Sequence, residues 1–138
     1  MAKNSKSVQL KADEKRSRNI NINFYPEDLP DDWKERIDSL GIKLILSPLH
    51  DQDYNADGTP KKAHHHAMFL NSNKKTVKQM MDELANLFGV SPSGSVIGVP
   101  HGQLTIDRTA TVRYMAHLDH PDKAQYPAEE IQGRNGAD

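Results

Sequence analysis

Apolar residues and asparagines alternate along residues 18–24, where Ile20, Ile22 and Phe24 occupy every second position. Because successive side chains of a β-strand point to opposite faces, this alternation predicts a strand with one buried face. Apolar runs predict three further strands, over residues 42–46, 64–70 and 104–106. The polar segment between the second and third predicted strands contains the turn dipeptide Asp57-Gly58, so we expect these two strands to be antiparallel.

Three segments have apolar residues at helical spacing, and each is preceded by a polar capping residue and followed by Gly or Pro. We expect these helices between Asp31 or Asp32 and Gly41, between the cap 71–73 and Gly89, and over 108–118 after the cap Asp107. The order strand, helix, strand, strand, helix, strand is that of a split βαβ unit. The predicted fold class is therefore α+β, a ferredoxin-like antiparallel sheet with an extra C-terminal helix that carries Tyr114.

The 138 residues suit one domain, which we place at 18–127, between a flexible basic arm at 1–17 and a polar tail or hinge at 128–138. The chain contains no cysteine, which excludes a disulfide scaffold, thiolate metal sites and cysteine catalysis. No apolar run approaches the roughly 20 residues of a membrane span, and the N-terminus lacks the apolar stretch of a signal peptide. We therefore expect a cytoplasmic protein without a membrane partner.

Charged residues are segregated along the chain, although the formal net charge is only −1. Residues 1–18 carry a net charge of +4 and residues 61–78 of +5, whereas residues 27–38 carry −4. A local basic patch attracts a polyanion whatever the net charge of the whole chain; the alternative is that these segments are ordinary solvated surfaces. The candidate phosphate contacts are Lys61, Lys62, Lys74 and Lys75.

Three consecutive histidines begin the third predicted strand. In a strand, His64 and His66 share one face and His65 points to the other. Two imidazoles at this spacing can bind one divalent ion, at roughly 2.1 Å from each nitrogen. The alternative is a group of surface histidines that binds no metal.

A second cluster, His50 with Asp51 or Asp53, follows the preceding strand, and the intervening loop brings it beside the histidine strand. Three imidazoles and a carboxylate suit Mg²⁺, Mn²⁺ or Zn²⁺, and the carboxylate favours the harder ions. A calcium loop of the EF-hand type is disfavoured, because Gly58 falls two positions too late and no Glu follows at the required place. Weaker signals come from His101, His117 and His120.

The last predicted helix carries Tyr114 next to Arg113. A tyrosine is most often a core or interface residue, and a phenol with a pKa of about 10 is a poor nucleophile. A metal that polarises a phosphate makes the attack feasible, and the product is a phosphotyrosine. Arg113 is a candidate phosphate clamp in that reaction.

Three segments in this order resemble the origin-binding and nicking domain of plasmid rolling-circle replication initiators of the RepB-like type, within the HUH endonuclease class. These segments are residues 47–53, 61–66 and 112–126, and the opening segment 21–26 is also similar. In the family the middle residue of the histidine motif is typically hydrophobic or aromatic, and here it is His65. The resemblance spans residues 18–127.

The resemblance implies a metal site for Mn²⁺, or alternatively Mg²⁺, with the ligands His50, Asp53, His64 and His66. It implies that Tyr114 attacks a scissile phosphate of single-stranded DNA in an origin hairpin loop and stays joined to the 5′ phosphate. A free 3′-OH then primes rolling-circle replication. The domain is also expected to bind duplex repeats of the plasmid origin, and a homo-oligomer is expected to form through a C-terminal domain absent from this chain.

Three alternatives stay open from the sequence. The first is an origin-binding module with a structural metal and no nicking activity. The second is another HUH enzyme, such as a relaxase or a transposase, and the third is a metal-binding α+β domain that does not bind DNA. The alternative nucleophiles are Tyr25 and Tyr126.

Overall fold

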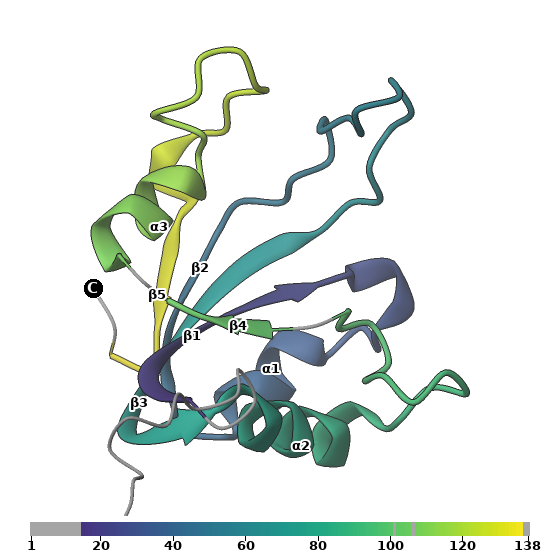
Figure 1. Ribbon diagram of the computed structural model, residues 1–138, viewed down its shortest axis with the longest axis vertical. Helices are drawn as coiled ribbons and strands as arrows, with labels where there is room; N and C mark the ends of the chain where they lie inside the picture. Colours follow the sequence, from purple (N-terminus) through teal and green to yellow (C-terminus); the bar gives the residue numbers. More distant parts are fainter. Residues whose placement is uncertain (1–14, 101, 106, 137–138) are drawn as a thin grey trace, which may run out of the picture.

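A five-stranded antiparallel sheet forms the centre of the computed structural model, which describes residues 15–100, 102–105 and 107–136 (Figure 1). The strands lie in the order β4-β1-β3-β2-β5. Their bounds are β1 Arg16–Phe24, β2 Lys43–Leu46, β3 His65–Thr76, β4 Gly102–Leu104 and β5 Gln132–Arg134. Because β3 pairs with both β1 and β2 and separates them, the predicted α+β fold with its split βαβ unit is confirmed.

Helices cover both faces of the sheet. Helices α1 (Trp33–Asp38) and α2 (Val77–Phe88) follow β1 and β3 and pack on one face, whereas α3 (Arg108–Tyr114) packs on the other. The described residues also form the short 3-10 helices η3 (Pro26–Asp28) and η4 (Ala128–Glu130). Within the described ranges, no helix is long and apolar enough to cross a membrane.

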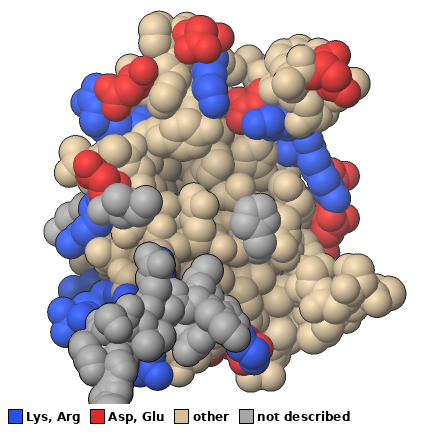
Figure 2. All heavy atoms as spheres, viewed as in Figure 1, with Lys and Arg blue, Asp and Glu red and all other residues tan. Residues whose placement is uncertain are grey.

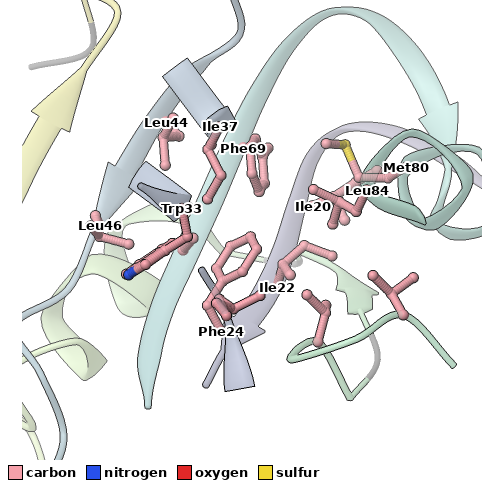
Figure 3. Packing of buried hydrophobic residues seen from close by; sticks show 14 residues of the cluster. Ile20, Ile22, Phe24, Trp33, Ile37, Leu44, Leu46, Phe69, Met80 and Leu84 are labelled. Atoms are coloured by element: carbon pink, nitrogen blue, oxygen red, sulfur yellow. The ribbon is translucent and has the colours of Figure 1, made fainter. Parts of the chain in front are cut away.

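The main hydrophobic core lies between the sheet and helices α1 and α2 (Figure 3). Phe24 is completely buried there, with its ring centroid 5.4 Å from that of Trp33 and 6.2 Å from that of Phe69. Ile20 and Ile22 enter the same core, as the alternation of the first strand predicts. Each side chain of this kind contributes about 1.5–3 kcal/mol when it is buried. On the opposite face, a smaller cluster holds α3 against the sheet, formed by Ile45, Met68 and Met115.

The start of α2 differs from the prediction. Residues 71–73 do not cap the helix, because β3 continues through Thr76 and its last residues pair with the start of β1. The side chain of Asn71 instead donates a hydrogen bond to the carbonyl of Arg18. Thr76 forms a capping box with Gln79, which satisfies two backbone N–H groups at the start of the helix. The predicted cap was therefore wrong because the partner strand β1 begins early enough to extend β3.

The ends of α3 and of the chain also differ from expectation. Asp107 caps α3 as predicted, but the helix stops at Tyr114 instead of Leu118, and His117 adopts a positive φ of 58° in the turn that follows. In the segment expected to be a polar tail, η4 and β5 form, and β5 pairs with β2. The guanidinium of Arg134 donates to Asp38 and fastens this strand to the end of α1.

Two sequence expectations fall partly beyond the described residues. Of the flexible arm expected at 1–17, residues 1–14 lie outside them. Its last two residues, Arg16 and Ser17, belong to β1 because they pair with the end of β3, so this part of the prediction was wrong. The fourth strand was expected at 104–106; the structure has β4 at Gly102–Leu104, and residue 106 is outside the described part.

Candidate metal centre and tyrosine nucleophile

The start of β3 divides the three histidines between the two faces of the sheet. His64 is joined to His50 by two backbone hydrogen bonds of 2.7 and 3.1 Å, which fixes the register of this segment. The rings of His64 and His66 lie on the side of α3, with their centroids 4.9 Å apart. His65 lies on the core side, where its ring is 5.4 Å from Trp33 and its Nδ1 donates to the carbonyl of Ser47. The predicted alternation therefore places His64 and His66 together.

Asp53 is the carboxylate that joins this cluster, and Asp51 is exposed outside it. The Oδ2 atom of Asp53 lies 3.1 Å from Nδ1 of His50 and 3.6 Å from Nε2 of His64. Ligand atoms bound at about 2.1 Å to one ion are separated by roughly 3.0–3.4 Å, so this spacing fits a shared divalent cation. Ligand atoms of His50, His64 and His66 also lie within 4.8 Å of one another.

The hydrogen bonds of the rings leave nitrogen lone pairs available for a metal. His64 Nδ1 donates to the carbonyl of Lys62 at 2.8 Å, and His66 Nδ1 lies 2.8 Å from the amide oxygen of Asn23. Both contacts leave Nε2 unprotonated, which is the usual arrangement of metal-binding histidines. His50 Nε2 donates to the carbonyl of Met115 at 2.6 Å, so its Nδ1 faces the Asp53 carboxylate with a lone pair. A divalent ion or a proton between these two atoms would relieve the repulsion of their lone pairs.

The protonation states also suit a cation. Burial lowers the pKa of His50, and burial together with the neighbouring histidines lowers the pKa of His66 to about 3. Burial opposes the ionisation of Asp53, but the hydrogen bond from Tyr126 and the nearby imidazoles outweigh it and lower the pKa of this carboxyl. The imidazoles of His50 and His66 are therefore neutral and the Asp53 carboxylate is ionised at neutral pH, which are the forms that bind metals.

Tyr114, at the end of α3, faces the histidine cluster. Its ring centroid lies 5.5 Å from that of His66, and its hydroxyl accepts a hydrogen bond of 3.2 Å from Nζ of Lys123. Tyr114 lines a cavity of about 330 Å³ together with His64 and His66. It also lines a larger cavity of about 730 Å³ that extends over β1 and β4.

The other two candidate tyrosines have different surroundings. Tyr126 is buried, and its hydroxyl donates to Oδ1 of Asp53 at 2.6 Å. Burial and this hydrogen bond raise the pKa of the Tyr126 phenol, so it is a poor nucleophile. Tyr25 lies beside the smaller cavity, with its ring 6.2 Å from that of His64 and the ammonium of Lys62 5.0 Å above it. The Tyr126 hydroxyl is thus engaged with Asp53, whereas Tyr114 lines the cavity beside His64 and His66.

His117 lies in the histidine cluster, although it was only a weak candidate from the sequence. Its ring is 4.7 Å from that of His50, and its Nδ1 donates to the carbonyl of Ala124 at 2.7 Å. Among the described residues, its buried Nε2 has no hydrogen-bond partner. With His50 and Asp53 it forms a second group that could hold an ion. The sequence signal that could have identified His117 is its position three residues after Tyr114.

The remaining histidine predictions have simple outcomes. The ring of His120 lies 5.4 Å from that of Tyr114, and the residue is exposed. His101 lies outside the described residues, so its role stays open.

The predicted phosphate contacts fall into two groups. Lys61 and Lys62 line the smaller cavity beside the histidines, and Lys62 is paired with Asp28. Lys74 and Lys75 lie near the opposite end of β3, about 30 Å along the strand from His65 at roughly 3.3 Å per residue.

Two of the predicted contacts are also held by acidic neighbours. Arg113 forms a two-pronged ion pair with Asp119, and Lys75 pairs with Glu83 at 2.7 Å. In the view of Figure 2, charged side chains lie around the edge of the face, and its centre is largely uncharged. The basic residues that the structure describes therefore form no single continuous patch on this face.

The fold and the site thus define a class of protein: an α+β domain in which a histidine–carboxylate cluster faces a tyrosine. Residues 12–138 match the family described as the origin binding domain of plasmid replication proteins, and the chain belongs to this family.

Named relatives agree with this assignment. The chain is 37% identical over 134 residues to the replication protein RepB of Lactiplantibacillus plantarum, which covers 97% of this chain and 56% of that protein. It is 33% identical over 125 residues to a replication protein of Staphylococcus aureus, with 89% of this chain and 57% of that protein covered. The chain therefore spans just over half the length of these relatives.

Proposed function

We propose that this domain binds plasmid origin DNA and nicks one strand by metal-dependent attack of Tyr114 on a phosphodiester. The observation that carries this proposal is the common cavity of about 330 Å³ that Tyr114 shares with His64 and His66. A scissile phosphate in this cavity would lie between the phenol and the proposed metal ligands. Membership of the origin-binding family supports plasmid origin DNA as the partner.

The proposed ligands are His50, Asp53, His64 and His66. A divalent ion bound there, Mn²⁺ or Mg²⁺, would polarise a phosphoryl oxygen and stabilise the charge that develops during attack. The chain supplies the other parts. Burial of His50 and the carbonyl of Met115 hold the ligand cluster in place beside the end of α3, and Lys123 orients the Tyr114 hydroxyl.

The proposed reaction is a transesterification. The Tyr114 oxygen forms a bond to phosphorus, and the bond from phosphorus to the 3′ oxygen breaks. The phenol proton leaves to solvent, and the departing 3′ oxygen takes up a proton and becomes a free 3′-OH. The 5′ phosphate stays joined to the tyrosine, which preserves the bond energy for later strand joining.

Among the wider alternatives, the family match favours a replication protein over a relaxase or a transposase. An origin-binding module that has a structural metal and does not nick DNA is the second candidate. The two candidates differ in one observable, a covalent link between Tyr114 and DNA. Binding of hairpin loops and duplex repeats is part of both.

The test is to incubate the protein with a pool of single-stranded DNA and Mn²⁺ and to look for protein-linked DNA on a denaturing gel. We expect an adduct that requires the metal, is lost in Tyr114→Phe and persists in the control Tyr54→Phe. Tyr54 is 65% exposed, which makes its hydroxyl a suitable control. An adduct that survives in Tyr114→Phe would exclude this nucleophile. Metal-dependent DNA retention without an adduct in any variant would favour the binding module.

A further inference from the structure

Tyr126 contacts two of the proposed metal ligands at once. Its hydroxyl donates a 2.6 Å hydrogen bond to Oδ1 of Asp53 and accepts a 3.1 Å hydrogen bond from the backbone N–H of Gln52. Its ring stacks on the ring of His50, with the centroids 4.1 Å apart and the planes within 11°. Only 8% of the residue is exposed. The phenol is therefore held in one orientation against the ligand cluster.

The loop after α3 fixes Tyr126 in this place. The side-chain amide of Gln125 donates to the backbone carbonyls of His117, His120 and Lys123, each at 3.0 Å. The N–H of Tyr126 donates to the carbonyl of Ala116 at 3.3 Å. These bonds fold residues 117–126 back on the end of the helix that carries Tyr114. The loop thereby connects the proposed nucleophile to the ligand cluster.

The hydrogen bond from Tyr126 divides the two oxygens of Asp53 between two tasks. Oδ1 accepts the phenol, whereas Oδ2 faces Nδ1 of His50 at 3.1 Å and Nε2 of His64 at 3.6 Å. A carboxylate whose second oxygen accepts a short hydrogen bond is held so that its other oxygen is directed at the ion, which favours binding through one oxygen. The ring stack limits the rotation of the His50 ring, so its Nδ1 stays directed at Asp53. Hydrogen-bond partners of metal ligands fix ligand orientation and basicity in this way.

We propose that Tyr126 is a positioning residue for the metal centre: it keeps Oδ2 of Asp53 and Nδ1 of His50 directed at the position that the ion would occupy. This inference rests on the metal site of the proposed function. It assigns Tyr126 a role other than nucleophile, because the hydroxyl that would attack is the group that holds Asp53. A carboxylate held in this way would leave room at the ion for a phosphate oxygen.

The primary test is metal affinity, measured by titration calorimetry with Mn²⁺ on the whole chain. Tyr126→Phe retains the ring and its stack on His50 and removes only the hydroxyl. We expect its dissociation constant for Mn²⁺ to rise by about 10- to 100-fold, as for other partners of metal ligands. The matched control Tyr54→Phe removes an exposed hydroxyl and should leave the constant unchanged. The visible absorption of bound Co²⁺ should change in Tyr126→Phe alone, because the carboxylate is then free to chelate.

A double-mutant cycle separates this role from general stabilisation. In an Asp53→Ala background, Tyr126→Phe should cause no further loss of Mn²⁺ affinity, because the oxygen that it holds is gone. Gln125→Ala, which loosens the loop and leaves the phenol in place, should weaken binding by a smaller factor. This variant also serves if Tyr126→Phe fails to fold.

Three results would overturn the proposal for Tyr126. They are Mn²⁺ affinity within twofold of wild type in Tyr126→Phe, an equal loss of affinity in the Asp53→Ala background, and a lower thermal midpoint of the metal-free protein with affinity retained. Failure of the wild-type protein to bind Mn²⁺ would instead overturn the metal site of the proposed function. The two failures are thus distinguishable in the same titration.

Discussion

The two faces of β3 put the same residue types to different uses. On one face, His65 packs against Trp33 and continues into the core formed around Phe69. On the other face, His66 lies beside His50 with a ring separation of 4.6 Å and faces the cavity that contains Tyr114. His65 and His66 are neighbours in the chain, yet one packs against the core and the other joins the proposed ligand cluster. The face of β3 on which a histidine lies, and not its residue type, thus decides whether it packs in the core or lies in the histidine cluster.

Both faces bury neutral imidazoles. Burial lowers the pKa of His65, and its Nδ1 bonds the carbonyl of Ser47. Burial lowers the pKa of His66 to about 3, while its Nδ1 contacts the side chain of Asn23 and its Nε2 stays available. On the core face, the His65 ring is hydrogen-bonded to the backbone of Ser47. On the other face, ring nitrogens of His50, His64 and His66 lie within 4.8 Å of one another. The comparison can therefore be tested one face at a time.

The largest effect is expected from Phe69→Ala, which opens a cavity in the core face. Phe69 is fully buried and packs edge-on against Phe24. Its truncation should lower the free energy of unfolding by about 3–5 kcal/mol, measured by urea unfolding in EDTA. Leu118→Ala, at a position that is 43% exposed, is the control and should change stability by less than about 0.5 kcal/mol. Equal effects of the two changes would contradict the assigned core.

Replacing the two neighbouring histidines one at a time should affect different properties, the affinity for metal in one variant and the free energy of unfolding in the other. His66→Ala should abolish measurable Mn²⁺ binding and leave the fold intact. His65→Ala should lower the free energy of unfolding by about 1–3 kcal/mol, because the carbonyl of Ser47 loses its donor, and should retain Mn²⁺ affinity. Calorimetry and urea unfolding on both variants provide the two readouts. The reverse pattern would mean that the assigned register of β3 is wrong.

Stability of the metal-free protein should fall in mild acid. The pKa values of His50, His65 and His66 are lowered by burial in the folded chain, whereas an unfolded histidine titrates at about 6.5. Below that pH the unfolded chain binds protons that the folded chain excludes, so the free energy of unfolding decreases as the pH falls toward 3. Urea unfolding in EDTA between pH 7.5 and 4.5 measures this slope.

The variant His65→Leu should show a shallower dependence of the free energy of unfolding on pH. The unfolded variant lacks the His65 imidazole and therefore binds one proton fewer in acid. An unchanged slope would indicate that His65 is protonated equally well in both states.

The smallest effect concerns the two groups of lysines. For a short single strand centred on the cavity, Lys61→Ala should weaken binding and reduce the salt slope by about 0.7. Lys74→Ala should leave this slope unchanged, because Lys74 lies about 30 Å along β3 from the histidines. Fluorescence anisotropy at several salt concentrations measures both. An equal reduction by the two variants would indicate that a short strand reaches both ends of the sheet.

Local patterns predicted the elements that depend on short-range periodicity. The alternation around Ile22 predicted β1 and its buried face, and the spacing of His64 and His66 predicted their common side. The predicted helix cap at 71–73 failed because it depended on the length of a partner strand about 50 residues earlier in the chain. The end of α3 was overestimated, since the turn at His117 is held by the carbonyl of Ala124 and not by a local sequence signal.

The sequence alone determined the order of the first four strands and three helices along the chain, the fold class and the residue types of the candidate site, because these follow from side-chain period and chemistry. Only the tertiary structure decided between Asp51 and Asp53 and brought His117 beside His50. It also gave Tyr114 and Tyr126 different surroundings, with one phenol facing a cavity and the other bonded to a carboxylate. The physical reason is that the contacts between His66 and Tyr114, His50 and Met115, and Asp53 and Tyr126 join residues 48, 65 and 73 positions apart, where no local periodicity constrains them.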